Sequence, residues 1–257
     1  MEDCEEEINP LNSFVQYSQF DADPDMDSSN EYCDGEVTKL LMYPKFKTFC
    51  YKFTRNLTGI SQQIYTTGDN KKCQFLNYWI YYELIKNGFH NNNDNTFIYD
   101  VINSIRLLWT QYNYYNNCNF QNYKISVSDF NIMKDLQDYS ENHSIIKGKI
   151  SLKDKNCKNY YCSYIKKIVQ LYRKIVTQCS STDSKQYCSV LNEIQLSKGP
   201  DNLYDEFDCS SGYSEVSSEQ LEQFAGSKFE YSFTFGDTDV YLSEDTSVDS
   251  SSNTGLK

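Results

Sequence analysis

The sequence has few of the residues on which catalytic sites most often depend. Only two of its 257 residues are histidines, His90 and His143. His90 stands in an asparagine-rich run that reads as a loop, and His143 stands where we expect a helix to have ended, so neither neighbourhood would orient an imidazole as a base. The glycine-rich phosphate loops and the G-x-S-x-G nucleophile elbow are also missing. We therefore expect that the chain is not an enzyme and that it holds no cofactor.

Basic residues are also scarce, which limits the partners that the chain can have. Lysine and arginine together number 24 against 36 aspartates and glutamates, which gives a net charge of −12. Nucleic acids attract clustered lysine and arginine, so we expect no nucleic-acid partner. The acidity favours solubility, although it would also steer the chain toward a basic partner.

Long apolar runs are absent as well. The first seven residues, Met-Glu-Asp-Cys-Glu-Glu-Glu, lack the positive and apolar regions of a signal peptide. No run of about 18 apolar residues occurs that could cross a membrane. Export would therefore depend on elements outside this sequence or on an unusual route. Two glycosylation patterns begin at Asn56 and Asn142, but an asparagine-rich chain produces such patterns by chance.

What the sequence does have is cysteine. The ten cysteines are Cys4, Cys33, Cys50, Cys73, Cys118, Cys157, Cys162, Cys179, Cys188 and Cys209. An even number spread along a soluble chain predicts disulfides and an oxidising compartment. Zinc binding is the competing interpretation, but it usually needs C-x2-C spacings, which are absent here. A third interpretation is that single cysteines pack as buried free thiols. We expect disulfides and no metal site, and the pairing stays open.

Apolar residues recur at helical spacing in five segments. We predict helices over 46–64, 73–84, 98–112, 130–139 and 161–179. Pro44 suits the first turn of the first helix, and Ser128 suits the N-cap of the fourth. Gly68 and Gly88 suit the ends of the first two. Such amphipathic helices bury their apolar stripes against each other, which predicts a mainly α, bundle-like single domain. The stripe residues that we expect to be largely buried are Trp79, Ile80, Ile105, Trp109, Ile168 and Tyr172.

Composition divides the chain into three parts. Residues 1–35 are acidic and irregular, with one apolar group that predicts a short helix. Residues 36–209 hold the predicted helices and most of the cysteines, so we expect a disulfide-rich helical core there. Residues 210–257 are rich in serine, aspartate and glutamate, which is typical of a solvated stalk. The aspartates at 21–27 lack the glycine and the bidentate glutamate of a calcium loop.

One segment of the tail departs from this composition. Aromatic residues alternate strictly at Phe229, Tyr231, Phe233 and Phe235. The pattern over 229–242 predicts either a short hairpin or an extended strip that docks on the helical core. A solvated stalk with scattered aromatics is the alternative. We expect residues 210–228, which have few apolar side chains, to be cut early by proteases.

Two blocks and several single positions follow a recognisable order along the chain. The more specific block is Lys-Cys-Gln-Phe-Leu-Asn-Tyr-Trp-Ile-Tyr at 72–81, and the other is Phe-Cys-Tyr-Lys-Phe-Thr-Arg-Asn-Leu at 49–57. The remaining positions are Tyr32, Cys33, Cys118, 136–139, Cys162, Tyr164, Ile165, Leu171, Tyr172, Cys179, Cys188 and Cys209. Together they resemble the Plasmodium interspersed repeat family in its primate-malaria, vivax-type form. The resemblance covers residues 10–209.

The resemblance implies an exported, variable protein displayed at or near the surface of the infected red cell. It implies an ectodomain outside the membrane, anchored by a C-terminal transmembrane helix that this chain does not contain. Family members lack an ordinary signal sequence, which would explain its absence here. The family has no established catalytic residues, so only the cysteines carry over, and Cys4 lies outside the resembling region.

We therefore expect a variant surface antigen that displays variable loops on a helical scaffold, for immune evasion and host-receptor adhesion. Its partners would be host antibodies and a host cell-surface receptor. The loops expected to vary are 86–96, 113–126 and 141–156, because loops tolerate change. The tyrosine-rich runs at 78–82 and 112–115 would place some rings outward, where tyrosine can anchor an interface. The alternative is a non-enzymatic scaffold protein inside the host cell, where a reducing cytosol would leave the cysteines free.

Overall fold

The computed structural model describes residues 11–23, 30–91, 95–115, 117–149, 155–179, 185–210, 216–217 and 219–221. Helices dominate these residues, together with one two-stranded antiparallel sheet. In chain order the elements are α2 (Asn12–Asp21), α3 (Glu31–Lys39), α4 (Phe46–Thr67), α5 (Lys71–Lys86), β1 (His90–Asn91), β2 (Thr96–Phe97), α6 (Tyr99–Tyr112), α7 (Val127–Gly148), α8 (Lys155–Cys179), α9 (Tyr187–Ser197) and α10 (Pro200–Glu206). The prediction of a mainly α fold is confirmed.

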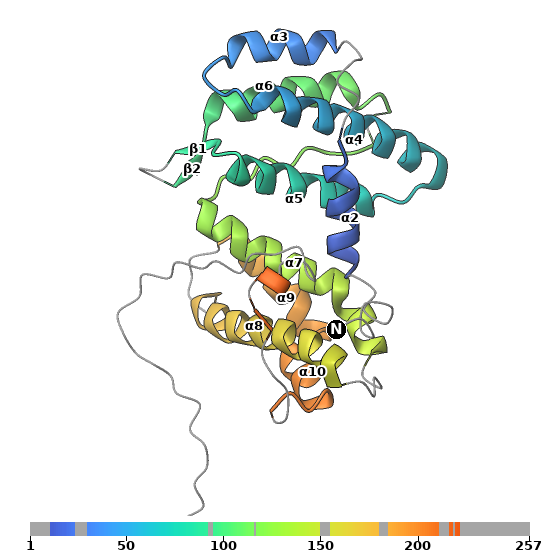
Figure 1. Ribbon diagram of the computed structural model, residues 1–257, viewed down its shortest axis with the longest axis vertical. Coiled ribbons are helices and arrows are strands. Elements are labelled where there is room, and N and C mark those ends of the chain that lie inside the picture. The colour runs from blue at the N-terminus through green and yellow to red at the C-terminus, as the bar shows by residue number, and fades with distance from the viewer. Residues whose placement is uncertain are drawn as a thin grey trace, which may run out of the picture.

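The helices are stacked along the long axis of the molecule in two groups (Figure 1). The N-terminal stack contains α3, α4, α5 and α6, and the C-terminal stack contains α7, α8, α9 and α10. Helix α5 packs against α7 where the stacks meet. Helix α2 contacts α4, α5 and α7, so it runs across this boundary. One contiguous apolar core extends through both stacks, from Leu11 to Leu221.

Helix α4 follows the predicted pattern. Its buried apolar residues recur at steps of three and four from Phe46 to Ile64. The helix ends where Gly68 adopts a left-handed conformation with a φ of 73°, which glycine reaches without steric strain. Gly88 likewise has a φ of 75° just after α5. Pro44 precedes α4 by two residues instead of lying in its first turn.

Helices α5 and α7 lie at the centre of the molecule and are covered on more than one side. Ten of the 16 residues of α5 and 13 of the 22 residues of α7 are buried. The buried residues of α7 include Lys134, Asp138 and Asn142, which are polar or charged. Buried polar groups need hydrogen-bond partners, so these side chains must find them within the protein.

Two predictions about the fourth helix are wrong. Its N-cap is Ser126, whose hydroxyl accepts a hydrogen bond from the backbone N–H of the third residue along at 3.1 Å. Ser128 lies inside the helix, with its hydroxyl 3.0 Å from that of Ser126. The helix also continues far beyond residue 139, so much of the loop predicted over 141–156 is helical. His143 therefore lies within α7 and not after its end.

The division predicted at residue 35 falls inside α3. The described residues before that point include all of α2, and the side chains of Tyr17, Phe20 and Cys33 are buried in the common core. The reason is that α2 carries large aromatic side chains, and Tyr17 and Phe20 are buried against Phe75 and Trp79 of α5. These N-terminal residues are therefore part of the helical domain.

Two residues of the predicted tail also contact the core. The Val216 N–H donates to the Ser163 hydroxyl at 3.1 Å, and its side chain packs against the apolar cluster. The Leu221 side chain is only 2% exposed. The predicted stalk therefore contacts the helical domain at these positions. The strip predicted over 229–242 lies outside the described residues.

The residues expected in the core are buried. Among the six, Trp79, Ile80, Ile105, Trp109 and Ile168 are buried, and Tyr172 is half-buried. The helix phases read from the sequence are therefore correct for these positions. The helices that the sequence pattern did not predict are α3, α9 and α10.

Candidate functional site

Four disulfides tie the described helices to one another and to the connecting segments. The pairs are Cys33–Cys50, Cys73–Cys118, Cys162–Cys209 and Cys179–Cys188. The first joins α3 to α4, and the second joins α5 to the segment after α6. The third joins α8 to the turn after α10, and the fourth joins α8 to α9. Each stack thus holds one bridge of short sequence separation, 17 or 9 residues, and one of long separation, 45 or 47 residues.

The structure places eight of the ten candidate cysteines in these pairs. Cys4 lies outside the described residues, and the side chain of Cys157 lies outside the described side chains. None of the eight is a free thiol, so the zinc and free-thiol interpretations are wrong for them. No group of three or more possible metal ligands occurs in the described part of the chain.

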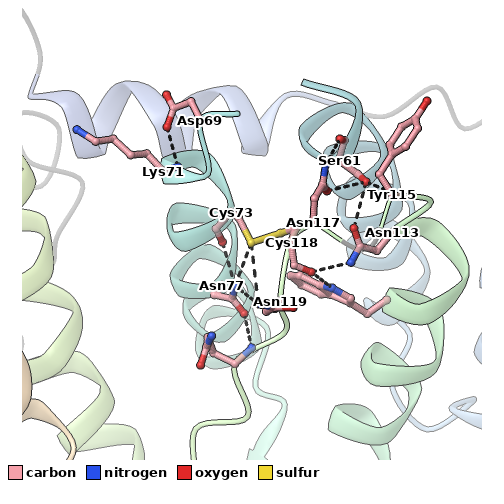
Figure 2. The surroundings of a disulfide bond; sticks show 12 residues. Ser61, Asp69, Lys71, Cys73, Asn77, Asn113, Tyr115, Asn117, Cys118 and Asn119 are labelled. Atoms are coloured by element: carbon pink, nitrogen blue, oxygen red, sulfur yellow. Dashed lines mark hydrogen bonds between the residues drawn. A yellow bond between two sulfur atoms is a disulfide. The ribbon is translucent and has the colours of Figure 1, made fainter. Parts of the chain in front are cut away.

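The Cys73–Cys118 bridge holds the long segment between α6 and α7 against α5 (Figure 2). The Asn77 amide donates to the Asn119 carbonyl at 3.0 Å, and the Asn77 side-chain oxygen accepts from the Gln121 N–H at 2.7 Å. The Asn77 side-chain amide thus provides hydrogen-bond partners for the backbone carbonyl of Asn119 and the backbone N–H of Gln121, as a paired strand would. This part of a predicted variable loop belongs to the scaffold.

The start of the same segment is tied to α4 and α6. The Ser61 hydroxyl lies 3.1 Å from the side-chain oxygens of both Asn113 and Asn117 (Figure 2). The Asn117 amide donates to the Ser61 carbonyl at 2.8 Å. The Trp109 indole and the Asn113 amide both donate to the Cys118 carbonyl, at 2.8 and 2.7 Å. Polar contacts therefore fix residues 113–115 and 117–121 from both sides, which limits their freedom to vary.

Helix α2 joins the two stacks through a polar cluster, here called the junction cluster, which consists of the buried Tyr17, Lys134 and Asp138 and the half-buried Tyr82. The Tyr17 hydroxyl and the Lys134 ammonium each donate to one oxygen of the Asp138 carboxylate, both at 2.6 Å. The ammonium also lies 4.4 Å from the Tyr17 ring centroid and 4.9 Å from that of Tyr82. Burial, reinforced by the Asp138 charge, holds the pKa of Tyr17 well above its ordinary value. These contacts fix how α2, α5 and α7 meet.

The two ends of α2 are held by other helices. The Ser13 N–H donates to the Asn142 side-chain oxygen at 3.0 Å, and the Asn142 amide donates back to the Ser13 hydroxyl at 2.8 Å. At the other end, the Trp79 indole N–H donates to the Asp21 carboxylate at 2.8 Å. Helix α2 is therefore anchored to α7 at its start and to α5 at its end.

The two glycosylation patterns are inside the fold. Asn142 has no exposed surface, and Asn56, which is 8% exposed, donates its amide to the Phe20 carbonyl at 3.0 Å. Neither amide is accessible to a glycan in the folded domain. The two histidines are half-buried, His90 on β1 and His143 in α7. Burial, together with the charges of two lysines, holds the pKa of His143 below its ordinary value.

Exposed tyrosine rings gather where α3, the end of α4 and the end of α6 meet. This tyrosine patch consists of Tyr32, Tyr65, Tyr112, Tyr114 and Tyr115. Tyr32 contacts Tyr112 and Tyr112 contacts Tyr114, with ring centroids 5.8 and 6.4 Å apart, and Tyr65 stacks on Tyr115 at 4.2 Å. Apart from the half-buried Tyr112, the rings are between 44% and 68% exposed. The run at 78–82, by contrast, is largely buried. Clustered rings of this kind can anchor a protein interface.

A groove with basic residues lies where the hairpin, α6 and the starts of α7 and α9 meet. Its volume is about 610 Å³. Phe97, Ile102 and Tyr123 contribute apolar surface, and the basic side chains are Arg106, Lys124 and Lys185. Part of the loop predicted over 86–96 forms the hairpin beside it, with His90 opposite Phe97 and Asn91 opposite Thr96. We call this feature the basic groove.

Comparison with known proteins identifies the family to which this chain belongs. The family model described as Plasmodium vivax Vir protein matches residues 11–255, which is almost the whole sequence. The chain belongs to the Plasmodium vivax Vir family. Membership of the Vir family supports a general role of the variant-surface-antigen type. Comparisons with curated proteins and with solved structures give no match. No helix of the described Vir residues is long and apolar enough to cross a membrane.

The block at 72–81, which carries most of the family resemblance, has a structural role in this Vir chain. Cys73 and Asn77 hold the segment after α6, and Trp79 holds the end of α2. Tyr78 stacks on Tyr123, with ring centroids 5.8 Å apart. The stretch of α5 from Cys73 to Trp79, less than two helical turns long, therefore contacts both α2 and the segment after α6, which are distant from it in sequence.

The buried tyrosines predict a loss of stability in alkali. Burial raises the pKa of both Tyr123 and Tyr161 to about 12, above the ordinary value of 10.0. In the unfolded chain these phenols lose their protons first, so stability is intact below pH 10 and falls as pH rises from 10 toward 12. We expect urea midpoints to fall over this range while tyrosinate absorbance rises cooperatively with unfolding. Tyr161→Phe should reduce the slope, and full titration of every tyrosine near pH 10 in a folded chain would contradict the prediction.

Proposed function

We propose that this Vir protein is displayed at the surface of the infected red cell and supports immune evasion by antigenic variation. Host antibodies are its first partners, and a host cell-surface receptor is a second. The proposal includes no catalytic step. It rests on one observation: the contacts that hold the fold are separate from the side chains that face solvent.

The scaffold is held by internal contacts. The disulfides, the junction cluster and the contacts of Asn77 are all buried or half-buried. Large side chains outside these contacts are exposed. They include four rings of the tyrosine patch (Tyr32, Tyr65, Tyr114 and Tyr115), and Leu41 and Met42 at 77% and 76%. Substitutions at exposed positions usually change stability by less than about 0.5 kcal/mol. The surface can therefore change in sequence while the fold persists, which is what antigenic variation needs.

The tyrosine patch is the first surface to test. The triple variant Tyr32→Ser, Tyr65→Ser, Tyr114→Ser removes three exposed rings, and loss of such anchors should weaken binding to a recognising partner by about tenfold or more. The measurement is binding of the full chain to antibodies from people exposed to Plasmodium vivax and to a panel of host cell-surface proteins. The matched control, Tyr99→Ser with Leu107→Ser, removes exposed apolar side chains from α6 outside the patch.

The expected result is a selective loss with the patch variant. Equal binding by the patch variant, the control and the unchanged chain would contradict the role given to the patch. The scaffold protein inside the host cell is the second candidate function. It predicts reduced cysteines, and the eight paired cysteines favour the displayed antigen instead.

A further inference from the structure

The basic groove is electrostatically unlike the rest of the chain. The chain carries a net charge of −12, yet three basic side chains and one carboxylate line the groove. Lys185 lies 3.3 Å from the Asp129 carboxylate. Arg106 and Lys124 are exposed and have no carboxylate within ion-pair distance among the described residues. Two of the three basic side chains in the groove therefore have no carboxylate partner within the part of the chain that the structure describes.

The groove also presents apolar surface. Phe97, Tyr123 and Ile125 are only partly buried, and Tyr99 is 74% exposed at its rim. Apolar surface beside basic side chains fits a ligand that alternates aromatic or aliphatic groups with carboxylates. An extended peptide has this form, because its successive side chains point to opposite faces.

The chain itself contains such a peptide. Aromatic residues occupy every second position from Phe229 to Phe235, and the carboxylates of Glu230, Asp237 and Asp239 lie among and after them. Residues 229–242 contain no lysine or arginine. The charge and the apolar content of this segment are therefore complementary to those of the groove.

The segment can reach the groove. The Val216 N–H is bonded to Ser163 on α8, and the far end of α8 is bridged by Cys179 to Cys188, close to Lys185 in the groove. The helix between Ser163 and Cys179 rises by about 24 Å. The 13 residue steps from Val216 to Phe229 include eight beyond Leu221, and these eight alone span up to about 26 Å when extended. The length of chain is thus sufficient.

We propose that residues 229–242 dock in the basic groove of the same chain. The aromatic side chains pack against Phe97 and Tyr123, and the carboxylates pair with Arg106 and Lys124. The docked segment returns the tail to the place where the two stacks meet and covers apolar surface that would otherwise face solvent. This inference does not depend on the antigenic role.

Hydrogen exchange of the full chain, read by mass spectrometry, tests the proposal. Amides of residues 229–242 should exchange at least about tenfold more slowly than in a free peptide of the same sequence. The variant Arg106→Glu with Lys124→Glu should raise their exchange to the free-peptide rate. The matched control, Lys45→Glu with Lys167→Glu, changes the net charge equally at exposed lysines outside the groove and should leave the protection unchanged.

Further variants and conditions separate the alternatives. Phe233→Ser with Phe235→Ser should also abolish protection, and thermal melts should show that each variant keeps its fold. Free-peptide exchange in the unchanged chain would overturn the proposal. Protection that survives the Arg106 and Lys124 reversal would overturn it too, because the segment would then lie elsewhere. Protection that disappears on dilution would identify a second copy as the source of the segment and would also overturn docking within one chain.

Discussion

Removal of the Cys162–Cys209 disulfide by Cys162→Ala with Cys209→Ala is expected to lower the free energy of unfolding by about 4 kcal/mol. The bridge spans 47 residues, so it restricts the unfolded chain strongly, and neither cysteine has any exposed surface. Domains are typically stable by only about 5–15 kcal/mol. Reduction of all the disulfides should therefore remove most of the stability. Urea unfolding with and without reductant measures both effects.

The Cys179–Cys188 pair provides the matched control. Its loop spans nine residues, so Cys179→Ala with Cys188→Ala should cost about 2.5 kcal/mol, clearly less than loss of the long bridge. Non-reducing mass mapping of native protein should recover the four described pairs. Ten free thiols in native material, or equal melting temperatures with and without reductant, would contradict both the structural role of the bridges and the displayed-antigen proposal.

The second large effect is expected from Lys134→Met, which should lower the free energy of unfolding by about 3–5 kcal/mol. The substitution keeps the length of the side chain but leaves the Asp138 carboxylate, which is only 1% exposed, without its ammonium partner. The junction cluster would then bury an uncompensated charge between the two stacks. Urea unfolding of the variant measures the loss.

A double-mutant cycle separates charge from packing. Lys134→Met combined with Asp138→Asn should lower the free energy of unfolding by less than the sum of the two single changes. The reason is that the amide introduced by Asp138→Asn would carry no charge, yet its oxygen could still accept a hydrogen bond from the Tyr17 hydroxyl. Arg173→Met, which breaks the exposed pair with Asp201, is the control and should cost no more than about 1 kcal/mol. Equal losses for Lys134→Met and Arg173→Met would show that the junction cluster is not important to stability.

Much of the fold could be predicted because it follows from local patterns. The apolar spacing in α4, α6 and α8 describes helices with one buried face and one solvated face, and such helices are visible in sequence. Gly68 and Gly88 marked helix ends because they adopt backbone conformations that other residues avoid. The even number and the spread of the cysteines predicted disulfides, since the competing zinc interpretation usually needs other spacings.

The candidate site was harder to predict. The loop expected over 113–126 has the composition of a variable surface loop, but Asn77 and Ser61, far away in sequence, bond to its backbone and side chains. In the sequence, only the family block at 72–81 marked Asn77 as part of a specific motif, and the block did not indicate that Asn77 bonds to this loop. The basic groove draws its residues from separate segments, and no local pattern brings them together.

By itself, the sequence determined the mainly helical class, the phases of most helices, the oxidised cysteines and the family. These depend on periodicity, composition and order along the chain. Only the tertiary structure decided the cysteine pairing, the place of α2 across two stacks and the burial of Lys134, Asp138 and Asn142 in α7. The physical reason is that a polar side chain can be buried only when distant segments supply its partners. The sequence of α7 alone does not indicate that Tyr17 and Ser13 of α2 will bond to its Asp138 and Asn142.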